Sequence, residues 1–309
     1  MPPSGKSPAS ARGAVSRDVW TTRKLLNWMI GHFEARQIDS PRVVAEMLLS
    51  HVLNCERMRL YMEVDRPAGD AELAQLRDLV ARAAKHEPAQ YLTGHAWFFS
   101  RPFEVSRATL IPRPSTETLV EHVLQWRRSA PERANLVIAD IGTGTGCIAV
   151  SLAAQLKDAR VIATDIVPEA LELARRNAAR HRVDDRIEFR LGDGTAPLAA
   201  GAVGERYDVI CSNPPYVSDS EWDELEPNVK LYEPTSALRG GTDGMDVIRR
   251  LLRDAPPLLL PGGQLLIEIG HHQRDAVLAI AHGHAMLTDP VVLKDHEGFW
   301  RVLAATRLG

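Results

Sequence analysis

The fold of this chain is decided at Asp140-Ile141-Gly142-Thr143-Gly144-Thr145-Gly146, a glycine-rich stretch between a strand-like run and a helical pattern. The run before it covers 136–141, and the helical pattern after it covers 147–157. Glycines at such a junction allow a tight turn and a close approach between backbone and ligand. The stretch therefore predicts the first strand, loop and helix of an α/β sheet, with a ligand site at the loop.

The rest of the C-terminal part continues this alternation. A second helical pattern covers 168–182, and strand-like runs fall at 136–141, 161–165, 187–191, 207–212, 263–269, 287–293 and 299–305. Strands that alternate with helices in this way favour a mostly parallel sheet with right-handed crossovers. We expect one Rossmann-like α/β domain over 113–309.

The N-terminal part has apolar residues at helical spacing, which predicts a small helical domain over 18–89. Its apolar stripes are Leu25, Leu26, Met29, Ile30 and Phe33, then Val43, Val44, Met47, Leu48 and Val52. Residues 90–112 are rich in aromatic residues and predict a β-hairpin that links the two domains. Residues 1–17 lack the apolar stretch of a secretory signal. Their prolines and glycines also oppose a transit helix, so we expect a disordered tail.

Composition narrows the class of protein. The 309 residues are 45% hydrophobic and 25% charged, with a net charge of −3, which is typical of a globular protein without a strong cationic field. Neither a nucleic-acid partner nor a membrane partner is therefore indicated. Cys55, Cys147 and Cys211 are widely spaced and form no CxxC pair, which disfavours zinc and disulfides. We expect no metal and a reducing, cytoplasmic location.

The glycine loop does not match the dinucleotide fingerprint GxGxxG, because Cys147 stands where the third glycine belongs. Asp140 would repel a pyrophosphate, but it would attract the cationic groups of S-adenosylmethionine, directly or through water. Asp165, after the second strand, can accept hydrogen bonds from ribose hydroxyls. The alternatives are a turn-capping carboxylate for Asp140 and a helix N-cap for Asp165. Together with Gly142, Thr143, Gly144, Thr145 and Gly146, they predict S-adenosylmethionine as cofactor.

The chemistry is predicted at Asn213-Pro214-Pro215-Tyr216, directly after the run 207–212. If the first and fourth strands are neighbours, this segment faces the methyl group of the cofactor. A conjugated nitrogen is a poor nucleophile, and the Asn213 side-chain oxygen with the Pro214 carbonyl can each accept one of its N–H bonds. Tyr216 offers an aromatic face. We expect Asn213, Pro214 and Tyr216 to be catalytic. A proline turn that ends a strand is the alternative, and glutamine and adenine both remain possible substrates.

These two motifs resemble the protein-glutamine N5-methyltransferases, and the likeness extends from about residue 20 to 305. Further marks of the resemblance are Glu87-Pro88, Tyr91 to Gly94, Leu110 to Pro114, Thr116-Glu117, Glu233-Pro234 and Asp243-Gly244. The resemblance implies a class I methyltransferase fold. It also implies a substrate, the glutamine in the Gly-Gly-Gln motif of class 1 peptide-chain release factors, which the N-terminal helical domain helps to hold. By position, Asn213 contacts both cofactor and glutamine, and Pro214, Pro215 and Tyr216 complete the glutamine site.

Several alternatives stay open beside the resemblance. Ser115 replaces an acid of the family, and Gly194 replaces an aromatic residue that some members carry after Asp193. Asp193 itself can accept from the adenine amino group or cap a turn. Arg113 and Glu117 can shape the pocket entrance or form ion pairs. A ribosomal-protein glutamine, an adenine of nucleic acid and a non-catalytic binding role are the competing functions.

Overall fold

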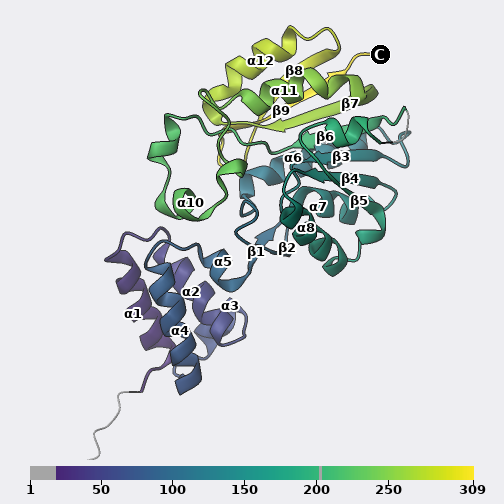
Figure 1. Ribbon diagram of the computed structural model, residues 1–309. Coiled ribbons are helices and arrows are strands. Elements are labelled where there is room, and N and C mark those ends of the chain that lie inside the picture. Colours follow the sequence, from purple (N-terminus) through teal and green to yellow (C-terminus); the bar gives the residue numbers. More distant parts are fainter. Residues whose placement is uncertain (1–18, 202–203) are drawn as a thin grey trace, which may run out of the picture. The chain divides into compact units, whose positions relative to one another are not determined.

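The computed structural model describes residues 19–201 and 204–309. The chain divides into two compact units, one that ends at Lys85 and one from His86 to Gly309. Figure 1 shows helices in the first unit and a sheet flanked by helices in the second. The tail predicted at 1–17 lies outside the described residues.

The first unit is built from amphipathic helices. They are α1 (Thr22–Glu34), α2 (Pro41–Val52), α3 (Arg57–Met62) and α4 (Asp70–Ala83). The stripe predicted on α1 is buried at Leu25, Leu26, Met29 and Phe33. On α2 the predicted stripe is partly wrong, because Val43 is 42% exposed whereas Ala45 and Leu49 are fully buried. Since α2 packs against both α1 and α4, its two neighbours select a different buried face.

The second unit begins with α5 (Ala89–Thr93) and a hairpin of β1 (His95–Phe98) and β2 (Arg101–Glu104). The two turn residues, Phe99 and Ser100, have φ of 48° and 58°. Two left-handed residues give the twist that a two-residue hairpin loop needs. The hairpin predicted within 90–112 therefore starts later than expected, because its first residues form α5. A single helical turn is too short to show a helical period.

A seven-stranded sheet forms the centre of this unit. Its order is β5-β4-β3-β6-β7-β9-β8; β9 runs antiparallel to both β7 and β8, and the other neighbouring pairs are parallel. The strands are β3 (Val137–Ile141), β4 (Arg160–Asp165), β5 (Ile187–Leu191), β6 (Tyr207–Ser212), β7 (Leu259–Glu268), β8 (Leu287–Lys294) and β9 (Trp300–Arg307). The expected mostly parallel sheet is confirmed, as is the pairing of the first and fourth predicted strands, here β3 and β6.

Helices cover both faces of the sheet, as Figure 1 shows. Successive strand residues alternate between two cores, so that Ile138 joins one and Ala139 the other. The first core includes α6 (Glu117–Ser129), α7 (Cys147–Gln155) and α8 (Pro168–Arg180), and the second includes α9 (Ala196–Ala199), α11 (Asp246–Asp254) and α12 (Arg274–His282). The short α10 (Pro227–Tyr232) lies in the connection from β6 to β7. The unit is thus an α/β/α sandwich with a switch in strand order between β3 and β6.

No helix within the described ranges 19–201 and 204–309 is both long and apolar enough to cross a membrane.

Candidate active site

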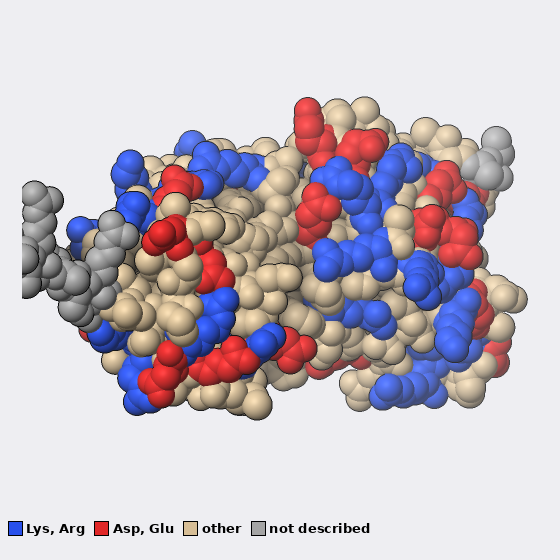
Figure 2. Space-filling view, turned by 90° about the horizontal axis from the view of Figure 1, so that it is seen from below, with Lys and Arg blue, Asp and Glu red and all other residues tan. Residues whose placement is uncertain are grey.

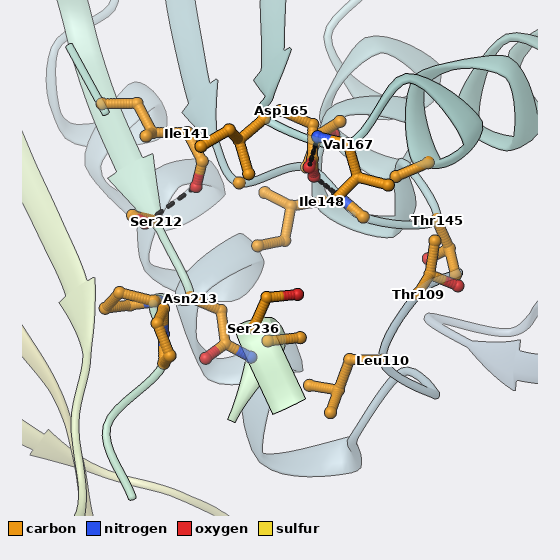
Figure 3. A pocket seen from close by; sticks show the side chains of 18 of the residues that line it. Thr109, Leu110, Ile141, Thr145, Ile148, Asp165, Val167, Ser212, Asn213 and Ser236 are labelled. Atoms are coloured by element: carbon orange, nitrogen blue, oxygen red, sulfur yellow. Dashed lines mark hydrogen bonds between the residues drawn. The ribbon is translucent and has the colours of Figure 1, made fainter. Parts of the chain in front are cut away.

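A cavity of about 360 Å³ opens beyond the carboxyl ends of β3, β4 and β6. Its wall comes from the segments that follow these strands and from residues within 108–116, the turn Thr235–Ala237 and α11. Figure 3 shows Asp165 and Val167 on one side of this cavity and Asn213 and Ser236 on the other. The order of the strands therefore brings the two predicted motifs, 67 or more positions apart in sequence (213 − 146 = 67), to one cavity.

The glycine loop is held in a conformation that ordinary residues avoid. Gly142, Gly144 and Gly146 have φ of 72°, 54° and 79°. A Cβ added at Gly142 or Gly144 would meet nothing within 4 Å, whereas one at Gly146 would lie 3.1 Å from the Cβ of Ala174 on α8. The first two glycines therefore keep ligand space open, and the third lets α7 and α8 pack closely.

Asp140 lies beneath the loop and is fully buried. Its Oδ2 accepts from the Thr143 hydroxyl at 2.6 Å and from the amide of Ala149 at 3.2 Å. Burial raises its pKa to about 7, against the opposing effect of these two hydrogen bonds. Asp140 does not belong to the cavity wall, so its contact with the cofactor, directly or through water, stays a prediction. The side chain ties the loop to the first turn of α7.

Asp165 lines the cavity, as the sequence predicts. One carboxylate oxygen accepts from the amide of Gly144 and the other from the amide of Val167, each at 2.9 Å. Burial raises the pKa of this carboxyl, and those backbone bonds oppose the rise. Some acceptor capacity remains beside these backbone bonds, because a carboxylate offers about four acceptor positions. Asp165 therefore holds the turn that leads into α8, whose N-cap is Val167, and can still accept from ribose hydroxyls.

Asp193 and Gly194 lie at another part of the cavity wall, next to Arg250 of α11. Arg250 donates to Asp193 Oδ1 at 2.7 Å, and Gly194 has φ of 56°. Arg250 is a residue that the sequence analysis missed, since nothing in the spacing of α11 links it to a loop 56 positions earlier (250 − 194 = 56).

The segment after β6 reaches the cavity through Asn213, Pro214 and Pro215. The Ser212 hydroxyl donates to the Ile141 carbonyl at 2.8 Å, which ties the ends of β6 and β3 together. The side-chain nitrogen of Asn213 donates to the hydroxyl of Thr116 at 3.1 Å. Because its nitrogen is engaged, the carboxamide oxygen of Asn213 is left to accept from a ligand.

Tyr216 occupies a different position from the one expected. It does not belong to the cavity wall, and its ring packs against the second core. Its hydroxyl donates to Glu268 at 3.5 Å, a long hydrogen bond. Burial raises the pKa of Tyr216. An aromatic contact between Tyr216 and a substrate therefore stays a prediction, whereas its link to Glu268 is present.

Arg113 and Glu117 have separate partners. Arg113 lines the cavity and pairs with Glu233, whose second oxygen accepts from the Ile111 amide. Glu117 accepts from the amide of Phe99 at 2.7 Å and so fixes the hairpin turn. Arg113 thus both lines the cavity and forms an ion pair, whereas Glu117 supports the fold.

Among the described residues, no group of three or more His, Cys, Asp and Glu could hold a metal ion. His272 lies 3.2 Å from a carboxylate oxygen of Glu221, and Cys55, Cys147 and Cys211 are all free thiols.

The cavity residues fit S-adenosylmethionine. The loop leaves open space at Gly142 and Gly144, Asp165 offers acceptors for hydroxyls, and Ile148 and Val167 provide apolar wall. The wall thus combines Asp165 and Asp193 with Arg113, Arg250 and apolar side chains, which suits a ligand that carries charges of both signs, a sugar and a flat ring.

Known proteins share this organisation. Residues 24–94 match the family described as PrmC N-terminal domain, and residues 114–226 match the Methyltransferase small domain. Release factor glutamine methyltransferase from Geobacter sulfurreducens is 40% identical over 94% of this chain and 98% of its own length. The same-named protein of Koribacter versatilis is 41% identical over 93% of this chain and 99% of its own length.

A solved structure supports the fold alone. The hMettl16 catalytic domain, in complex with a 3′UTR hairpin, has a TM-score of 0.52 and 14% identity, over 79% of this chain and 84% of that one. Sheet order, glycine loop and domain match together define an S-adenosylmethionine-dependent methyltransferase. More narrowly, the chain belongs to the release factor glutamine methyltransferase family.

Proposed function

We propose that this enzyme transfers the methyl group of S-adenosylmethionine to the side-chain amide nitrogen (N5) of the glutamine in the Gly-Gly-Gln motif of class 1 peptide-chain release factors. The support is the near full-length match to two relatives that carry the name release factor glutamine methyltransferase. The observation that carries the chemistry is the Asn213 carboxamide, held by Thr116 with its oxygen free at the cavity.

The protein has two tasks in this reaction. When bound, S-adenosylmethionine supplies an electrophilic methyl group. Asp165 and the glycine loop hold the cofactor, with Asp193 and Arg250 at another part of the wall. Asn213 Oδ1 and the Pro214 carbonyl accept the two N–H bonds of the glutamine amide, which orients its nitrogen and stabilises the positive charge that develops there. Pro214 lacks an N–H donor and fixes its own φ, so this acceptor stays in place.

The substrate proposal extends to the rest of the chain. We assign the helical domain over 18–89 to holding the release factor, and the methyltransferase domain over 113–309 to transfer. Figure 2 shows Lys and Arg interspersed with Asp and Glu on the face in view. Mixed charges of this kind suit a protein substrate better than direct binding of nucleic acid. A cytoplasmic location follows from a partner in translation.

The test is transfer of labelled methyl to a purified release factor, with mass mapping of the modified residue. We expect one methyl group on the glutamine of the Gly-Gly-Gln motif and none after that glutamine is changed to alanine. Asn213→Ala should lower transfer by at least about 100-fold. Label that persists without the glutamine would overturn the proposal. Parallel reactions with ribosomal protein, DNA and RNA test the competing substrates.

A further inference from the structure

Glu268 is a fully buried carboxylate behind the segment Asn213 to Tyr216. It is the last residue of β7, and β7 pairs with β6, which leads into that segment. The hydroxyl of Tyr216 donates to its Oε1, and its Oε2 has no hydrogen-bond partner among the described residues. The cavity wall does not include Glu268, so it reaches any ligand only through other side chains.

Thr116 connects this carboxylate to Asn213. Its hydroxyl accepts from the Asn213 side-chain nitrogen at 3.1 Å, and the same side chain interacts with the Glu268 carboxylate. Thr116 is 2% exposed, so water has little access to this hydroxyl. The three side chains come from three separate parts of the chain and form one buried polar connection.

The direction of this connection follows from the donors available. An ionised carboxylate only accepts, and a hydroxyl has one proton. Thr116 therefore donates toward Glu268 and must accept from Asn213, which turns the carboxamide nitrogen toward Thr116 and the oxygen away from it. A protonated Glu268 could instead donate to Thr116, whose own proton would then point at Asn213. The carboxamide would turn over and present its nitrogen to the substrate.

We propose that Glu268 is a positioning residue that sets, through Thr116, which end of the Asn213 carboxamide faces the cavity. The proposal rests on the function given above, because it concerns the same glutamine site. An amide substrate offers two N–H donors and needs an acceptor there, so only one orientation of Asn213 supports transfer. A turned Asn213 carboxamide would place its own N–H donors against the N–H donors of the substrate amide.

The environment of Glu268 brings its titration near neutrality. Burial raises its pKa to about 7, and the side chains of Thr116, Arg301, Arg113 and Tyr216 oppose the rise. The neighbouring Cys147 of α7 also faces this charge. Above about pH 7 the carboxylate is ionised and Thr116 donates to it. Below that pH it takes up a proton, so the fraction of correctly oriented Asn213 should fall.

Glu268→Gln tests the proposal, because it keeps the shape and removes the charge. We expect kcat to fall by up to about 100-fold, the Kd for S-adenosylmethionine to stay within about threefold, and the limb near pH 7 to vanish from the kcat profile. Thr116→Val should have the same effect, and Thr116→Ser should restore activity. The double variant Glu268→Gln with Thr116→Val should lose no more kcat than either single variant.

The matched control is Glu205→Gln. Glu205 also accepts from a tyrosine hydroxyl, that of Tyr207 at 2.9 Å, but lies outside the cavity wall. This variant should keep the kcat and the pH limb of the unaltered enzyme, although it loses stability. If Glu268→Gln also keeps both, Glu268 does not position Asn213.

A readout without turnover separates this proposal from the proposed function. The side-chain amide resonances of Asn213, assigned by their loss in Asn213→Ala, should shift between pH 6 and 8 in the unaltered protein and stay fixed in Glu268→Gln. Resonances that do not respond to pH, or respond equally in both proteins, overturn the positioning role. Failure of the unaltered enzyme to methylate a release factor would overturn the substrate assignment and leave this readout intact.

Discussion

One guanidinium nitrogen of Arg250 lies 2.7 Å from Asp193 Oδ1 and 3.0 Å from the point where a Cβ of Gly194 would stand. The space that a side chain at Gly194 would need is thus bordered by a planar cation. The resemblance described under Sequence analysis implies an aromatic residue at that position in some members of the family. Here Arg250 supplies a flat surface from α11, and guanidinium planes stack well on aromatic rings.

Removal of Arg250 should therefore weaken cofactor binding more than it weakens the fold. We expect Arg250→Ala to raise the Kd for S-adenosylmethionine by about threefold to tenfold. The free energy of unfolding should change by less than about 0.5 kcal/mol, because the pair with Asp193 is exposed. Calorimetric titration measures the first and urea denaturation the second. Arg253→Ala, on the same helix but outside the cavity wall, is the control and should leave the Kd unchanged.

A glycine with positive φ can avoid backbone strain and can also leave space for a ligand. Alanine substitutions separate these two roles. Gly144 and Gly298 have φ of 54° and 88°, and neither would meet an atom within 4 Å of an added Cβ. Both changes should cost about 1–2 kcal/mol of stability through backbone strain. Only Gly144→Ala places a methyl group at the cavity, so only this variant should lose cofactor affinity, by about tenfold or more. Equal affinities in the two variants would contradict the assigned ligand space.

The hairpin offers adjacent residues on opposite faces. Phe98 is buried in the first core, whereas Trp97 is 66% exposed. Phe98→Ala should reduce the free energy of unfolding by about 3–5 kcal/mol, because it leaves a cavity in the core. Trp97→Ala should change it by no more than about 0.5 kcal/mol. Urea denaturation compares the two, and similar losses would show that the hairpin packs differently.

Asp140 should make stability depend on pH. Its pKa is raised from 3.8 to about 7 in the folded protein. Between these values the folded state binds a proton that the unfolded state has released, so the free energy of unfolding falls as pH rises from about 4 to 7 and then levels off. The fall is at most on the order of 4 kcal/mol.

Asp140→Asn checks this assignment. Both hydrogen bonds to Asp140 end on one oxygen, Oδ2, so an asparagine oxygen can accept both. Without a titrating group, the variant should lose Asp140's part of the slope between pH 4 and 7, measured by urea denaturation at several pH values. An unchanged slope would place the titration elsewhere. Glu268, whose pKa is also raised to about 7, should keep its own part of the slope.

Local sequence patterns were sufficient to predict those parts of the site whose binding groups lie on adjacent residues. The loop from Gly142 to Gly146 and the segment from Asn213 to Pro215 combine backbone freedom, rigidity and acceptor groups within a few positions. The strands β4 and β5 were equally evident, because the helical patterns of α7 and α8 precede them. Amphipathic spacing was a weaker guide, since the stripe predicted on α2 included the exposed Val43 and left out the buried Ala45.

The sequence by itself determined an α/β methyltransferase with a loop for S-adenosylmethionine and an acceptor segment for a planar nitrogen. Tertiary structure alone decided what surrounds them. In the folded protein Asp140 lies beneath the loop and Arg250 lies beside Asp193. Thr116 and Glu268 lie behind Asn213. The reason is physical. Hydrogen-bond direction and desolvation depend on distances across the sheet, and the order of its strands sets those distances through packing that no local pattern encodes.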